Sequence, residues 1–266
     1  MIEGLASLLG GVILVFWSAD RFVTGAAATA RCLGIPSLLI GMVVVGFGTS
    51  APEIFISAVS SLQGNPGIAV GNAWGSNIAN ISLILGASAL VRPIEVRSGV
   101  LKRELPVLLA ATGLAAFLFR DGMLSRSDGW AFLGVFSALL VWSVFEGTVR
   151  KGDALESVVE RELDEAALSL SRAVLLTAGS LVLLLVSSKL LVWGAVRLAR
   201  AGGVSDLVVG LTVVALGTSL PELASSLSAV RKGEFDIALG NAIGSNLFNT
   251  LAVVGIAGVI RPASLP

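Results

Sequence analysis

The sequence predicts an all-α polytopic membrane protein built from two inverted copies of one segment. Of its 266 residues, 55% are hydrophobic and only 14% are charged, whereas soluble domains carry about 25% charged residues. Eight stretches are apolar and about long enough to cross a bilayer as helices. One segment of the first half also recurs in the second half. These three observations set the fold class before any single residue is considered.

The composition also excludes several classes of function. The formal net charge is zero, so no basic footprint exists for a nucleic-acid partner. Histidine is absent and Cys32 is the only cysteine, which nearly excludes a zinc or copper site and any intrachain disulfide. No dinucleotide-binding or phosphate-loop motif is present, so we expect no cofactor and no enzyme activity. Oxygen ligands for hard cations remain possible.

The apolar stretches follow one another along two halves of the chain. The first begins at Ile2 without a basic leader, so we interpret it as a span rather than a cleaved signal. A mixed-charge segment at 148–170 is expected to be a solvated cytoplasmic linker with a short surface helix. It separates a first half at 1–147 from a second half at 171–266. The eight expected spans are 4–30, 37–62, 68–91, 104–119, 129–147, 171–199, 206–230 and 236–260.

The two halves are related by duplication with inverted topology. Residues 41–93 align with 210–262 without a gap and give 22 identities in 53 positions. Glu53 lies in the second span and Glu222 in the seventh, five spans later. An odd number of spans means that the copies cross the bilayer in opposite directions, which is an architecture of secondary transporters.

The second copy is expected to be incomplete. It stops at Pro266, the counterpart of Arg97, so eight helices are present of an expected ten. Two explanations are open: the chain is a truncated form or fragment, or a second copy of it, in a homo-oligomer, covers the flank that this leaves exposed. The loops favour an external N-terminus, because eleven Lys and Arg then lie inside and five outside, in line with the positive-inside rule.

The second and seventh spans each place a carboxylate inside an apolar stretch. They read GFGTSAPE at 46–53 and ALGTSLPE at 215–222. A carboxylate at a helix centre costs about 3 kcal/mol, so it indicates a bound partner. The proline loosens the helix and frees carbonyls near the glycines, and such backbone is tolerated beside a cavity. The candidate oxygen donors, of the kind that calcium and sodium accept, are Gly46, Thr49, Ser50, Glu53, Ala215, Thr218, Ser219 and Glu222.

The third and eighth spans supply further polar side chains. They carry GNAWGSN and GNAIGSN, each followed by another asparagine. Residues four apart share a helix face, which forms the stripes Asn72, Ser76, Asn80 and Asn241, Ser245, Asn249. Hydrogen bonding between helices is an equally good explanation of these stripes, and the better one for Asn77 and Asn246. Asp20 and Lys189 occupy equivalent positions with opposite charge, so snorkelling or pairing is expected of them.

These paired motifs resemble the alpha-repeats of the calcium/cation antiporter superfamily, nearest its prokaryotic sodium/calcium exchangers. The resemblance implies ten helices in two inverted halves, in a prokaryotic plasma membrane, that exchange Ca²⁺ for Na⁺ by alternating access. The first and sixth helices would be the sliding elements. Asn249 replaces an aspartate of some members, which makes the ionised site −2 rather than −3. The implied ligands are Glu53, Glu222, Thr49, Ser50, Thr218, Ser219, Ser76, Asn80, Ser245, Asn249 and the carbonyls of Gly46 and Ala215.

Three alternatives stay open from the sequence. The chain could be a Ca²⁺/H⁺ antiporter, since a carboxylate in apolar surroundings holds its proton more readily than one in water. It could be a truncated Ca²⁺-binding membrane protein that does not transport. An intramembrane carboxylate hydrolase could also use two buried acids, although it would need neither the inverted repeat nor the surrounding oxygen donors.

Overall fold

The computed structural model describes residues 2–94, 96, 100–149, 168–203 and 215–264, and over these residues each of the eight expected spans is mainly helical. Within these residues, four helices are long and apolar enough to cross a membrane, or five if one bent pair is a single span, judged by length and composition alone. The linker at 150–167, with its expected surface helix, and the start of the seventh span at 206–214 lie outside the described residues. The first half contains α1 (Ile2–Leu33), α2 (Ser37–Ile40), η1 (Gly41–Gly46), α3 (Phe47–Thr49), α4 (Ala51–Leu62), α5 (Pro66–Ala79), η2 (Asn80–Ile84), α6 (Leu85–Val91), η3 (Val100–Glu104), α7 (Leu105–Leu118), η4 (Phe119–Asp121), β1 (Met123–Leu124) and α8 (Arg126–Val149). The second half contains α10 (Leu170–Ala201), α12 (Ala215–Thr218), α13 (Leu220–Lys232), α14 (Phe235–Leu247), η6 (Phe248–Val253), α15 (Val254–Ile260) and β2 (Ala263–Ser264).

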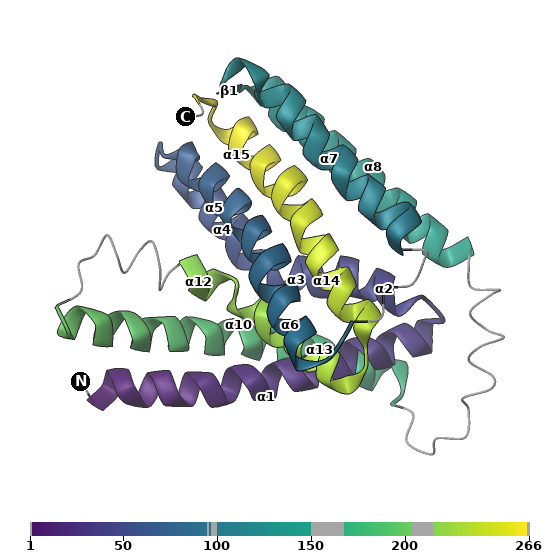
Figure 1. Cartoon of the computed structure of the whole chain (residues 1–266), viewed down its shortest axis with the longest axis vertical. Helices are drawn as coiled ribbons and strands as arrows, with labels where there is room; N and C mark the ends of the chain where they lie inside the picture. The colour runs from purple at the N-terminus through teal and green to yellow at the C-terminus, as the bar shows by residue number, and fades with distance from the viewer. Residues whose placement is uncertain (1, 95, 97–99, 150–167, 204–214, 265–266) are drawn as a thin grey trace.

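The two longest helices, α1 and α10, lie side by side and run antiparallel (Figure 1). Glycines bring their backbones close together. A Cβ added at Gly11 would lie 2.7 Å from the Cα of Leu191, and one added at Gly25 would lie 2.7 Å from the backbone nitrogen of Thr177. Small residues at helix contacts allow this close packing in membranes, so α1 and α10 form one paired unit.

The α1–α10 contact confirms the inverted relation of the two halves. Ser18 and Ser187 are separated by the same 169 residues as Glu53 and Glu222, and their Oγ atoms lie 3.4 Å apart. Equivalent residues of two copies can meet in this way only where a pseudo-two-fold axis passes between them. The axis therefore crosses the α1–α10 pair near Ser18.

The remaining helices form a bundle that stands across the α1–α10 pair, with α14 and α15 between α4–α5 and α7–α8 (Figure 1). The span Phe235–Ile260 is 83% buried over its most apolar window, whereas its counterpart Pro66–Val91 is 22% buried. Glycines again set the packing, since a Cβ added at Gly240 would lie 2.5 Å from the carbonyl oxygen of Leu38. The third span of the second copy is thus the centre of the bundle, which the shared motifs of the two spans did not predict.

Both Pro-Glu motifs interrupt their helices at a serine. Ser50, between α3 and α4, has φ −80° and ψ 5°, and Ser219, between α12 and α13, has φ −88° and ψ 6°. The two parts of the second span meet at a 44° bend. Each proline falls in the first turn of the new helix, where its missing N–H is not needed. The expected loosening of the helix is therefore a clean break that starts a new helix N-terminus.

Several local features add to the sequence prediction. The segments η1, η2, η3 and η6 are π-helical turns, and β1 pairs antiparallel with β2 over two residues each, a small exception to the all-helical fold. Asp20 is paired, as expected, with its Oδ1 2.9 Å from Nζ of Lys232, while Lys189 is exposed. A π-turn widens the helix locally and often marks a functional region; of these four turns in the described residues, η2 and η6 contain an asparagine of the predicted site.

Candidate cation site

The carboxyl groups of Glu53 and Glu222 are buried together at the centre of the bundle. Their exposed fractions are 0% and 2%. The two carboxyl groups are close enough for their negative charges to repel each other. Each glutamate lies in the first turn of the helix that follows its break. The positive end of a helix dipole favours negative charge there, so the breaks place two anionic groups opposite each other with dipolar support.

Each carboxyl group faces hydroxyls of the opposite copy. Ser50 donates a hydrogen bond to Oε1 of Glu222 over 3.3 Å. The hydroxyl of Thr49 also lies near that carboxyl group. The hydroxyl of Thr218, from the other copy, and that of Ser76, from the same copy, lie near the carboxyl of Glu53. The inverted repeat therefore brings the carboxylate of each copy to at least one hydroxyl of the other around a shared centre.

Several buried oxygens at this centre accept no hydrogen bond of normal geometry from the described residues. Among them are both carboxyl oxygens of Glu53 and Oε2 of Glu222. The side-chain amide of Asn249 and Oδ1 of Asn80 are also buried without a hydrogen-bond partner among the described residues. A buried polar atom without a partner is costly and a buried charge more so, and hard cations with oxygen preference supply the missing interaction. The unpaired oxygens thus fit a cation better than a purely structural network.

Asn241 of α14 organises the second-copy side of the site. Its Nδ2 lies within hydrogen-bond distance of the carbonyl oxygen of Glu222 (3.2 Å) and the hydroxyls of Ser225 (3.1 Å) and Ser226 (2.8 Å). Its Oδ1 accepts a hydrogen bond from Thr49 over 3.1 Å. The sequence placed Asn241 in a polar stripe but not among the ligands. The structure makes it the group that ties the glutamate backbone of one copy to a hydroxyl of the other.

The outer asparagines join the third and eighth spans. Asn80 donates to Oδ1 of Asn246 over 2.9 Å, and Asn77 donates to Oγ1 of Thr250 over 2.8 Å. The structural interpretation of Asn77 and Asn246 is confirmed by these bonds. Asn80 combines both expectations, because its nitrogen bonds between helices while its oxygen is buried without a donor.

The remaining predicted donors lie around the two breaks. Ser245 lies 3.5 Å from the carbonyl oxygen of Gly46, which also accepts the backbone N–H of Ser50 over 3.0 Å. That carbonyl is therefore hydrogen-bonded rather than freed by the proline. Ser219 is 5% exposed at the second break, and Ala215 is the first residue of α12, with its side chain outside the description.

Sequence reasoning missed a further pair of serines on the glutamate helices. Ser57 and Ser226 are equivalent in the two copies, lie four residues after the glutamates and are fully buried. Residues four apart share a helix face. The repeated pattern Glu-x-x-x-Ser was therefore a visible signal that both serines turn toward the same interior.

The donor set has the chemistry of a hard-cation site with few charges. The described residues contain no group of three or more His, Cys, Asp or Glu side chains that could hold a metal. Two carboxylates surrounded by hydroxyls and amides remain, with a total charge of −2 when both are ionised. Such a set suits a cation that is bound reversibly, since fewer charged ligands give weaker sites.

Known proteins similar to this chain include sodium/calcium exchangers. The model of the family described as sodium/calcium exchanger protein matches residues 3–145 and 172–266. The chain is 44% identical to the inner membrane protein YrbG of Escherichia coli over its whole length and 82% of that protein, and 30% identical to the sodium/calcium exchanger MaX1 of Methanosarcina acetivorans over 97% of this chain and 83% of that protein. A solved structure of the sodium-calcium exchanger NCX_Mj, soaked with Na⁺ and Ca²⁺, superposes with a TM-score of 0.87 at 36% identity, covering 100% of this chain and 84% of that one.

Proposed function

Because this chain belongs to the sodium/calcium exchanger family and is a membrane cation antiporter rather than an enzyme, we propose that it exchanges Ca²⁺ for Na⁺ at the Glu53–Glu222 centre. The observation that carries the proposal is the buried carboxyl pair with unpaired oxygens. The proposed ligands are those named from the sequence. Asn241 is proposed to position them.

Charge balance supports exchange by competition at this one centre. Two ionised carboxylates are neutralised by one Ca²⁺ or by two Na⁺ ions, and the hydroxyls and carbonyls could hold a third Na⁺. The same oxygens accept either ion, so the two ions exclude each other. A net charge of −2 in a low-dielectric interior is costly, so the loaded forms change sides more readily than the empty form. This difference couples the two fluxes.

The geometry also favours alternating access around a fixed centre. The centre lies between the inverted copies, where such transporters place their substrate. The paired helices α1 and α10 pack on each other through glycines, so they can move as one unit across the bundle. We propose that this sliding opens the centre to either side of a prokaryotic plasma membrane, with the N-terminus outside.

The test is Ca²⁺ uptake into vesicles driven by an outward Na⁺ gradient. Glu53→Gln and Glu222→Gln each remove one charge from the centre, and the attraction between unit charges about 4 Å apart is about 4 kcal/mol at an effective dielectric of 20. We expect uptake to fall more than tenfold in each variant. Glu234→Gln is the matched control, since Glu234 lies outside the centre and pairs with Arg31 at 3.5 Å. Wild-type uptake in either site variant would refute the assignment.

The burial of both carboxyls also supports a second candidate, exchange of Ca²⁺ for protons. Burial in apolar surroundings favours the protonated form of a carboxyl group, so a proton can replace the metal ion. The two candidates differ in one measurement, which is Ca²⁺ uptake under an imposed pH gradient without Na⁺. Uptake there would favour the proton antiporter. Ca²⁺ binding with no flux under either gradient would indicate a binding protein that does not transport.

A further inference from the structure

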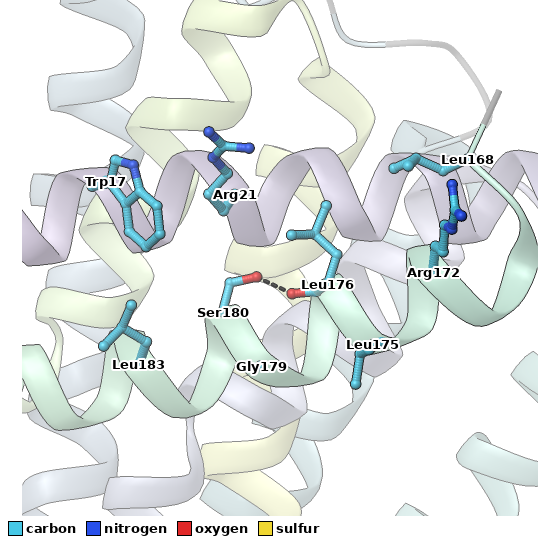
Figure 2. A pocket seen from close by; sticks show the side chains of 9 residues that line it. All are labelled: Trp17, Arg21, Leu168, Arg172, Leu175, Leu176, Gly179, Ser180 and Leu183. Atoms are coloured by element: carbon cyan, nitrogen blue, oxygen red, sulfur yellow. Dashed lines mark hydrogen bonds between the residues drawn. The ribbon is translucent and has the colours of Figure 1, made fainter. Parts of the chain in front are cut away.

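We propose that the groove between α1 and α10 binds an anionic glycerophospholipid, attracted by the charges of Arg21 and Arg172, with its acyl chain along the apolar wall. The groove has a volume of about 680 Å³ and is open along one side of the α1–α10 pair. It is lined by Trp17, Arg21, Leu168, Arg172, Leu175, Leu176, Gly179, Ser180 and Leu183. Figure 2 shows Trp17 and Arg21 projecting from α1 on the same side as Arg172, Leu176 and Leu183 of the second half.

The charge of this groove is the first argument for an anionic occupant. Arg21 and Arg172 form no ion pair with any described residue, and among those residues they are the only charged ones that line the groove. The acid nearest to Arg21 in sequence, Asp20, is already paired with Lys232. Guanidinium groups bind phosphate through paired N–H donors, and basic pockets between membrane helices bind anionic headgroups.

The depth of the groove relative to the bilayer surface is the second argument. Asp20 pairs with Lys232, and Arg31 pairs with Glu234, at the turn between α13 and α14. These ion pairs are partly exposed, so this turn marks where the bundle meets water and headgroups. Arg21 adjoins Asp20 and lies at the same level.

The apolar part of the wall is the third argument. Trp17 is 51% exposed. The guanidinium of Arg21 lies over its ring, with Cζ 5.4 Å from the ring centroid. Tryptophan is enriched where headgroups meet acyl chains. Leu183 lies beside Trp17, and Leu176 lies between Arg21 and Arg172 (Figure 2). Basic and apolar side chains therefore share one groove, as the headgroup and acyl chains of a phospholipid require.

The inverted repeat provides an internal comparison. Subtracting the offset of 169 residues places Glu3 at the equivalent of Arg172, and adding it places Leu190 at the equivalent of Arg21. Glu3 is paired with Arg197. The symmetry-related side of the α1–α10 pair therefore lacks both basic groups. The arginines belong to one side only, as expected if they recognise the headgroups of one leaflet.

The test is quenching of Trp17 fluorescence in nanodiscs that contain brominated phospholipids. Brominated phosphatidylglycerol is compared with brominated phosphatidylcholine at equal mole fraction, and the Trp17 signal is the difference between wild type and Trp17→Phe. We expect about a 30-fold preference for phosphatidylglycerol, which corresponds to about 1 kcal/mol for each arginine. Arg21→Gln with Arg172→Gln should reduce the preference to that of phosphatidylcholine.

Two further variants keep the proposal falsifiable. Arg21→Lys with Arg172→Lys retains both charges and should retain much of the preference, which excludes misfolding as the cause of a loss. Arg120→Gln with Arg126→Gln removes two exposed arginines at the α7–α8 turn and should change nothing. Equal quenching by the two lipids in wild type, or an unchanged preference in the glutamine variant, would overturn the proposal.

Discussion

Replacing Asn241 by alanine tests how far the amide of α14 holds the two copies together. The amide has two N–H hydrogens, shared among three acceptors between 2.8 and 3.2 Å, and its Oδ1 accepts from Thr49 at 3.1 Å and from Ser245 at the longer distance of 3.5 Å. About three full bonds are therefore lost. Interhelical hydrogen bonds in membrane proteins contribute about 0.6 kcal/mol each, so we expect a loss of about 2 kcal/mol in the free energy of unfolding.

Asn72 is the matched control because it is the equivalent residue of the first copy. It is only partly buried, and its Nδ2 has no hydrogen-bond partner among the described residues. Asn72→Ala should therefore change the free energy of unfolding by less than about 0.5 kcal/mol. Both variants are measured by denaturant titration in detergent, alongside Ca²⁺ affinity, which should fall only in Asn241→Ala because the backbone of Glu222 and the hydroxyl of Thr49 lose their shared partner. Equal destabilisation by the two substitutions would refute the reasoning.

Two further predictions use the same logic. Gly240→Ala should destabilise the protein by more than about 1 kcal/mol, because its Cβ would lie 2.5 Å from the carbonyl oxygen of Leu38. Gly71 is the equivalent residue, and no described atom lies within 4 Å of a Cβ added there, so Gly71→Ala should be neutral or stabilising through helix propensity. Thermal melts of the two variants measure the difference. Equal losses of stability would contradict the packing argument. Asp20→Asn breaks a partly exposed ion pair with Lys232 and should lower the free energy of unfolding by less than about 1 kcal/mol. In 1 M salt, where the ion pair is screened, the variant and the wild type should be equally stable.

The sequence predicted the parts of this fold that depend on pattern. Repeated motifs and an odd number of intervening spans are enough to infer inversion, and the contact of Ser18 with Ser187 confirms it. The pairing of Glu53 and Glu222 follows from the same symmetry, since equivalent residues near a pseudo-two-fold axis approach each other. Burial of the two carboxyls needed only their place in apolar spans.

The features that the sequence did not predict depend on which surfaces meet. Asn241 and Asn72 stand in almost identical heptapeptides, yet only Asn241 forms the network. The difference arises from neighbours far along the chain, such as η1, which packs against α14. The π-turns also escaped prediction, because a widened turn depends on tertiary contacts rather than on local periodicity.

Because the two copies are buried to different extents, equivalent substitutions in them can be compared as an internal control. Substituting both members of an equivalent pair changes the same chemical group in nearly the same local sequence, so intrinsic helix propensity and side-chain entropy cancel in the difference. What remains is the tertiary surroundings, which are 83% buried around Phe235–Ile260 and 22% buried around Pro66–Val91. Ligands that act through the shared centre should therefore give equal losses of transport in both copies, as for Glu53 and Glu222. Residues that act through packing should give unequal losses of stability, and this contrast separates the two roles without any external reference protein.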